Sequence, residues 1–163
     1  MNRMLTTPSP RWAIVGGKML SVFVLGMTQF VVLYLFTRFV LGVEWGGNAL
    51  ATFVVAAAEM LAVTGLATLI ASFARSERAA GGIGPLVVQI QALIGGAFFT
   101  IAVLPEWVQP IRYFSVIGWT MEAWSAIQTR GAGLGDVLVP VAALVGMSAA
   151  LFAVGVWRME AVR

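Results

Sequence analysis

Cysteine and histidine are both absent from this chain of 163 residues, and Asp136 is its single aspartate. The chain therefore has no possible disulfide or thiolate metal site, and it lacks the Ser–His pair, the aspartate pair and the His–Glu metal site of intramembrane hydrolases. No Gly-rich loop precedes Lys and Ser or Thr, because "GGKML" has neither the spacing nor the hydroxyl. We expect no catalytic, cofactor-binding or metal-binding residue, and any nucleotide should bind to another chain.

Charge is also scarce. Only 10% of the residues are charged and 60% are hydrophobic, whereas an ordinary soluble domain carries about a quarter charged residues. The mean hydropathy of +0.94 indicates a membrane protein. The net charge of +3 comes from basic residues at the ends of apolar runs and not from a patch. They are typical of topology signals, and nucleic acid is not an expected partner.

Four runs are long enough to cross the roughly 30 Å hydrocarbon layer, which takes about 20 apolar residues per helix. The sequence therefore predicts an all-α, polytopic helical membrane protein in which residues 1–163 form a single transmembrane domain. Asn48 is a plausible N-cap of the second span, and Pro85 is expected in the first turn of the third. The predicted spans are residues 13–41, 49–73, 83–104 and 137–157.

The positions of Lys and Arg set the expected orientation. With the N-terminus in the cytoplasm, three basic residues lie outside, namely Arg38, Arg112 and Arg130, and the other seven of the ten lie inside. Cytoplasmic loops carry the excess of such residues. We expect an integral protein of the plasma membrane, the cytoplasmic membrane of a bacterium, with both termini cytoplasmic.

Residues 105–136 are too many for a simple turn and too apolar for a soluble loop, since Trp, Phe, Ile and Met alternate with a few charges. Two short helices broken around residues 115–118 fit this pattern, as a hairpin in the outer interface or dipping into the membrane. A plain interfacial cap fits equally well.

Small side chains recur at spacings of three and four in the fourth span, so they share one helix face. Such a face lets a neighbouring backbone approach closely. We expect it to be buried against another helix. The residues are Ala142, Gly146, Ala149, Ala150 and Ala153.

Glu59 is the one carboxylate deep within a predicted span. A charge at the bilayer centre costs roughly 2.5–3.5 kcal/mol on insertion scales, so this side chain should face protein or a water-filled cavity. It could contact substrate or a proton, or make a structural hydrogen bond to a neighbouring helix. Four neutral polar residues could either line a pathway or form hydrogen bonds between helices: Thr28, Gln29, Gln89 and Gln91. Gln89 and Gln91 face different sides of a helix.

The start of the chain reads "RMLTTPSPRWAIVGGK", in which Ser9 is a good N-cap and Pro10 a good first helical residue. This segment resembles the coupling region of ABC transporter permeases of the type-2 exporter class. Two more segments are similar to that family, namely "FARSERAAG" and "GGAFFTIAVLPEWVQPIRYFSVIGWTMEAW". Thr100 and Val116 depart from the family pattern, in which proline is frequent, so bends there are expected to be softer.

The resemblance implies that residues 1–18 are a cytosolic coupling segment that contacts an ABC ATP-binding subunit, and that a second permease chain completes a homo- or heterodimer. It also implies that two spans preceding this segment are missing, as in an incomplete or split permease. A lipid anchor through Leu5 and Trp12 is the alternative for the segment, and a small oligomeric scaffold or channel without an ATPase is the alternative for the whole chain. The coupling residues would be Arg3, Leu5, Thr6, Thr7, Pro8, Arg11 and Trp12.

Overall fold

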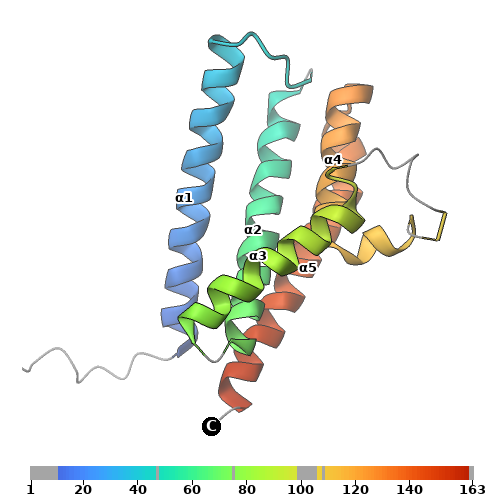
Figure 1. Cartoon of the computed structure of the whole chain (residues 1–163). Coiled ribbons are helices and arrows are strands. Elements are labelled where there is room, and N and C mark those ends of the chain that lie inside the picture. Colours follow the sequence, from blue (N-terminus) through green and yellow to red (C-terminus); the bar gives the residue numbers. More distant parts are fainter. Residues whose placement is uncertain (1–10, 47, 75, 99–105, 108, 162–163) are drawn as a thin grey trace, which may run out of the picture.

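The computed structural model describes residues 11–46, 48–74, 76–98, 106–107 and 109–161. These ranges contain five α-helices, one short 3-10 helix and no strand (Figure 1). The all-α prediction is thus confirmed. The helices are α1 (Arg11–Phe39), α2 (Ala49–Phe73), α3 (Glu77–Gly95), η2 (Ile111–Phe114), α4 (Val116–Arg130) and α5 (Leu134–Ala161).

Three of the helices are long and apolar enough to cross a membrane, over Gly16–Phe39, Ala49–Phe73 and Leu134–Met159. They correspond to three of the four predicted spans, and α2 has the predicted bounds. Asn48 caps α2 as expected, because its side-chain oxygen accepts a hydrogen bond from the Ala51 backbone N–H at 3.1 Å. The chain is an integral membrane protein.

Helix α3 differs from the predicted third span. It begins at Glu77, where the Ser76 hydroxyl accepts from the Ala79 N–H at 3.2 Å, so Pro85 lies inside the helix and not in its first turn. It ends at Gly95, and Gly96 follows with φ +83°, a left-handed conformation that favours glycine. With polar residues at its start and two glutamines later, α3 is not among the described helices that are long and apolar enough to span. Whether residues 83–104 cross the membrane stays a prediction, and residues 99–104 lie outside the described part.

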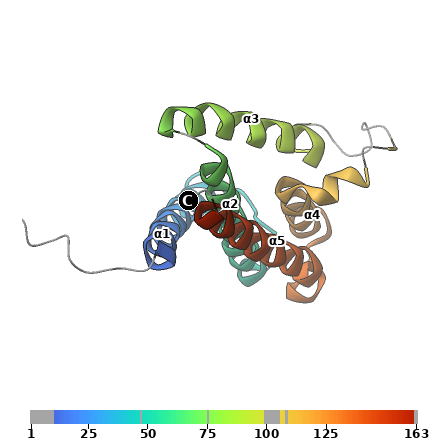
Figure 2. The same cartoon turned by 90° about the horizontal axis from the view of Figure 1, so that it is seen from below.

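The centre of the fold is the pair formed by α2 and α5, which pack along each other, while α3 runs obliquely at one side of the group (Figure 2). A Cβ atom on Gly65 of α2 would lie 2.8 Å from the Ser148 carbonyl oxygen of α5. Only glycine allows the two backbones to come this close. The core residues along this pair include Val55, Ala62, Val137 and Leu144, which are all buried.

The expected role of the small-residue stripe on α5 is wrong. All five residues of the stripe are exposed among the described residues, and nothing lies within 4 Å of a Cβ placed on Gly146. The close contact is made by a different face of α5: Gly155 is buried there, and a Cβ on it would lie 3.2 Å from the backbone of Thr68 and Leu69 in α2. The buried face of α5 carries Val137, Leu144 and Ser148.

The segment before α5 breaks at Ser115, within the range predicted. Its hydroxyl accepts from the Gly118 N–H at 3.3 Å and caps α4. The first of the two expected helices is only the 3-10 helix η2, since Pro110 and Ser115 bound it on either side. Helix α4 packs on α2 and α5 through the buried residues Ala123 and Ile127. The location of this segment at the outer membrane surface stays a prediction.

Candidate functional site

Glu59 of α2 lies against α4. The indole Nε1 of Trp124 donates a hydrogen bond to the Glu59 Oε2 at 3.0 Å. Among the described residues, neither of the ion pairs involves Glu59. An acidic group within a membrane-spanning helix is thus held by one neutral donor and not by a cation.

Trp124 also belongs to a group of five packed aromatic side chains, which we call the aromatic cluster: Phe30, Tyr34, Trp45, Phe53 and Trp124. Their ring centroids lie 5.1–6.1 Å apart, with Phe30 at 6.0 Å from Trp124 and 5.7 Å from Phe53. These separations are typical of tilted and edge-to-face packing. The cluster joins α1 to α2 and α4 through the half-buried side chains of Phe30 and Tyr34.

Two chemical roles are compatible with this arrangement. A carboxylate beside an aromatic ring can attract a cationic group, because ring faces carry negative electrostatic potential. The same carboxylate can also brace α2 against α4 through the indole hydrogen bond alone. Within a span, a charged Glu59 is costly without a partner, so protonation or a bound cation would both lower the free energy of the folded state.

The structure does not bring the other predicted pathway residues to Glu59. The side chains of Thr28, Gln29 and Gln89 are exposed, the first two on α1 and the third on α3. Thr28 donates its hydroxyl hydrogen to the Val24 carbonyl at 2.8 Å, within its own helix. These residues face lipid or a further protein surface, and the described structure forms no shared polar site from them.

Gln91 makes interhelical hydrogen bonds, the second of the two roles left open by the sequence. Its Oε1 accepts from the Val116 backbone N–H at 3.1 Å and from the Ser115 hydroxyl at 3.4 Å. These are donors at the start of α4, so Gln91 links α3 to the N-terminus of α4. The exposed Gln89 lies on another face, as its spacing predicted.

The sequence did not predict a cluster of three charged side chains near η2 and α4. Glu122 forms an ion pair with Arg112, and Arg130 approaches Glu122 at 3.5 Å. Burial by itself would lower the pKa of Arg112, but hydrogen bonds and charge attraction from Tyr113 and Glu122 raise it overall. Its guanidinium therefore stays charged. Spacing offers no signal for this pair, because ten positions and a helix break separate the two residues.

The predicted coupling residues fall mostly outside the described part. This applies to Arg3, Leu5, Thr6, Thr7 and Pro8, and to the proposed caps Ser9 and Pro10. Arg11 and Trp12 open α1, which continues without interruption through Lys18 into the first membrane-spanning segment. Their role in coupling stays a prediction.

Comparison with known proteins identifies the family. Residues 1–129 match the family model described as ABC-2 type transporter. The linearmycin resistance permease protein LnrN of Bacillus subtilis (strain 168) is 31% identical over 160 residues, which cover 98% of this chain and 41% of that relative. The chain thus spans less than half the length of the relative, and no solved structure matches it. With three membrane-spanning helices and this match over most of its length, the chain belongs to the ABC-2 type transporter family as a membrane permease component.

Proposed function

We propose that the chain forms part of the translocation pathway of an ATP-driven exporter, together with a second permease chain and a separate ATP-binding subunit. The observation that carries this proposal is the family match over residues 1–129. The sequence has no phosphate-binding loop of its own, so another chain would supply ATP hydrolysis. ATP binding and hydrolysis would shift the permease between inward- and outward-open states through their different affinities for the two.

Residues 1–18 would transmit this shift, in a plasma membrane with both termini in the cytoplasm. The segment leads directly into α1, so a displacement of its contact with the ATPase would tilt or shift a membrane-spanning helix. Arg11 would provide a charge at that contact. The alternative is a lipid anchor in which the arginines meet anionic headgroups, at about 1 kcal/mol for each basic residue.

Crosslinking separates these two roles. In a complete complex with the ATP-binding subunit, a single cysteine at Thr6 or Thr7 should crosslink to that subunit, since the native chain has no cysteine to interfere. Arg11→Glu should uncouple ATP hydrolysis from transport and leave membrane insertion unchanged. Normal assembly and ATP-driven transport after residues 2–9 are replaced by a Gly–Ser linker would rule out the coupling role.

Glu59 and the aromatic cluster are the proposed contact with cargo. They join three helices, α1, α2 and α4, at a point where a change in helix packing would alter the surroundings of the carboxylate. The name of the Bacillus relative connects that protein with linearmycin resistance. Linearmycin is therefore the first cargo to test, by comparing its accumulation in cells with and without the complete complex.

A scaffold or channel without an ATPase remains the competing function. The exposed small-residue stripe on α5 would suit its oligomer contacts. Co-purification decides between the two: an exporter should retain an ATP-binding-cassette subunit encoded beside it. A complex that contains only copies of this chain and shows no ATP-dependent transport would favour the scaffold.

A further inference from the structure

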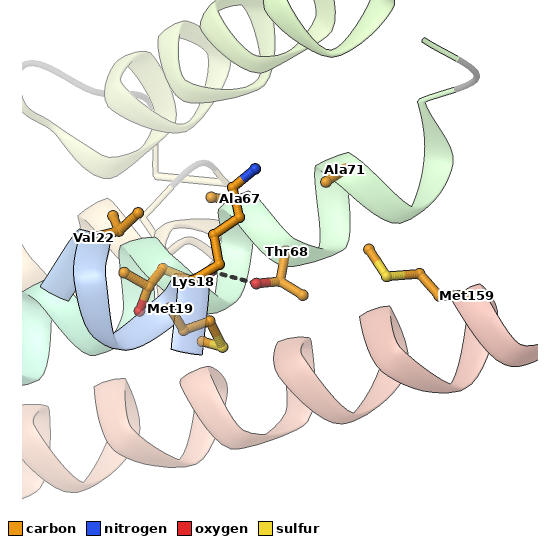
Figure 3. Close-up of a pocket in the computed structure, with 8 residues that line it drawn as sticks. Lys18, Met19, Val22, Ala67, Thr68, Ala71 and Met159 are labelled. Carbon is orange, nitrogen blue, oxygen red and sulfur yellow. Dashed lines mark hydrogen bonds between the residues drawn. The ribbon is translucent and has the colours of Figure 1, made fainter. Parts of the chain in front are cut away.

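A groove runs between α1, α2 and α5 at the end of the bundle that carries Lys18 and Met159. It consists of a hollow of about 230 Å³ beside Lys18 (Figure 3) and a second of about 450 Å³ that continues along α1 and α5. Met19 and Thr64 line both hollows, so the two lie side by side. Helix α2 forms the floor, because α1 and α5 each pack on α2.

The hydroxyl groups that line the groove do not need a hydrogen bond from an occupant. Each hydroxyl in its lining already donates to a backbone carbonyl: Thr64 to Leu61 at 2.8 Å, Thr68 to Thr64 at 2.9 Å, and Ser148 to Leu61 at 2.7 Å. Figure 3 shows the Thr68 hydrogen bond as a dashed line. Apart from Lys18, the remaining lining is apolar, including Met19, Phe23 and Phe152. An alkyl chain therefore fits this surface without leaving a polar group unpaired.

A positive charge stands at one end of the groove. Lys18 is exposed and lines the first hollow, and neither ion pair of the described residues includes it. Arg158 adds a second positive charge at this end, where its guanidinium lies 3.8 Å from the centre of the Phe73 ring. An occupant with an apolar body and an anionic head would thus meet complementary surfaces at both parts of the groove.

The length of the groove suits a lipid chain. From Leu61 to Ala71 the floor measures about 15 Å by helical rise, which is half of the roughly 30 Å hydrocarbon layer. An acyl chain with its head at Lys18 could therefore run along this floor within one leaflet.

We propose that this groove binds one acyl chain of an anionic membrane phospholipid, with the headgroup phosphate at Lys18. The bound lipid would fill the space that α1 and α5 leave open and would hold α1 beside α2 at this end. The side chains of residues 16–39 in α1 are exposed or half-buried, so a lipid in this position would add contacts to those that α2 already makes.

Photo-crosslinking tests the proposal on the chain in nanodiscs. The probes are phosphatidylglycerol and phosphatidylcholine that carry a diazirine on one acyl chain, and labelled positions are mapped by peptide mass spectrometry. Phosphatidylglycerol should label Met19, Thr64 and Phe152 more than the exposed reference residues Val24 and Leu138. Lys18→Gln should reduce that labelling about fivefold, the factor that corresponds to one basic residue near the surface, while Arg38→Gln at the other end of α1 should not.

A second variant keeps the test decisive if Lys18→Gln lowers expression. Ala149→Trp would place an indole in the groove and should abolish groove labelling, whereas Ala153→Trp on the same helix, outside the lining residues, should leave it intact. If both lipids labelled the groove equally and Lys18→Gln did not change the labelling, the lipid in the groove would be ordinary boundary lipid. That result would overturn the proposal. Labelled Val24 with unlabelled Met19 and Thr64 would show that protein covers the groove, which would also overturn it.

Discussion

The indole of Trp124 donates to the carboxylate of Glu59 across 3.0 Å, although 65 positions separate the two residues in the chain. The contact joins a short helix, α4, to a membrane-spanning one, α2, at the point where Phe30 of α1 also approaches Trp124. A carboxylate in this position has one neutral donor and no cationic partner among the described residues. That this carboxylate contacts a proton or a cationic group is the hypothesis that the first variant tests.

Replacement of Glu59 by Gln tests the role of the charge. Gln retains an oxygen that can accept from the Trp124 indole, so the melting temperature should stay near the native value. Transport by the complete complex should fall about tenfold, equivalent to about 1.4 kcal/mol, if the negative charge contacts cargo or a proton. The measurements are thermal unfolding in detergent and ATP-dependent uptake into inverted vesicles.

Trp124→Phe is the matched variant, because it removes the donor and keeps the charge and an aromatic ring. It should lower stability by roughly 1–3 kcal/mol, since the Glu59 carboxylate loses its donor. Native transport by Glu59→Gln, together with a destabilised Trp124→Phe, would mean that the pair only braces α2 against α4.

The close approach of α2 and α5 predicts intolerance at Gly65. A Cβ there would lie 2.8 Å from the Ser148 carbonyl oxygen, so Gly65→Val should force the two backbones apart. We expect a loss of roughly 1–3 kcal/mol from overpacking, measured as a lower yield of folded protein and a lower melting temperature. Gly146→Val is the control, because nothing lies within 4 Å of a Cβ at that position. Equal effects of the two substitutions would contradict the observed packing.

Hydropathy located the long helices because twenty apolar residues in a row have few alternatives to a span. It could not choose which face of α5 packs, since the exposed stripe around Gly146 and the buried face around Leu144 are both apolar. The choice depends on how the two helices fit together: Gly65 of α2 lies against Ser148, and Gly155 of α5 lies against Thr68 and Leu69.

The site was less predictable than the spans. Glu59 stands out as a lone carboxylate, but its partner Trp124 belongs to a segment that the sequence marks only as aromatic. The ion pair between Arg112 and Glu122 depends on the turn at Ser115, which folds η2 back beside α4. Such contacts arise from tertiary geometry, and local spacing does not encode them.

Gln91 should stabilise the first turn of α4. Gln91→Leu would leave the Val116 N–H without its side-chain acceptor, so hydrogen exchange over residues 116–119 should accelerate about fivefold to tenfold, as expected for a hydrogen bond of roughly 1 kcal/mol. Gln89→Leu changes the same functional group on an exposed face and should leave exchange unaltered. Matching exchange rates in the two variants would show that Gln91 does not cap α4.

The orientation predicted from the basic residues can be tested with reporter fusions. Fusions at Trp45 and Gly133 should report an external location, because each precedes a helix that would begin at the outer surface. A fusion at Ser76 should report a cytoplasmic one, since the connection between α2 and α3 would lie inside with Arg78. An external reading at Ser76 would reverse the assignment of both termini.

The two arginines beside Glu122 should differ in importance because they differ in burial. The Arg112 side chain is 6% exposed and Arg130 is 65% exposed, while both approach the same carboxylate. Loss of a buried partner leaves an uncompensated charge and costs roughly 3–5 kcal/mol, whereas an exposed ion pair contributes at most about 1 kcal/mol. Arg112→Gln should therefore lower the melting temperature markedly and loosen the contact between η2 and α4. Arg130→Gln should change the melting temperature little.

Adding Glu122→Gln to Arg112→Gln should recover part of the lost stability, because the double variant no longer leaves the Glu122 carboxylate without its closer partner. If Arg130→Gln destabilised the protein as much as Arg112→Gln, the stabilisation would come from the summed charge around Glu122 and not from the buried pair.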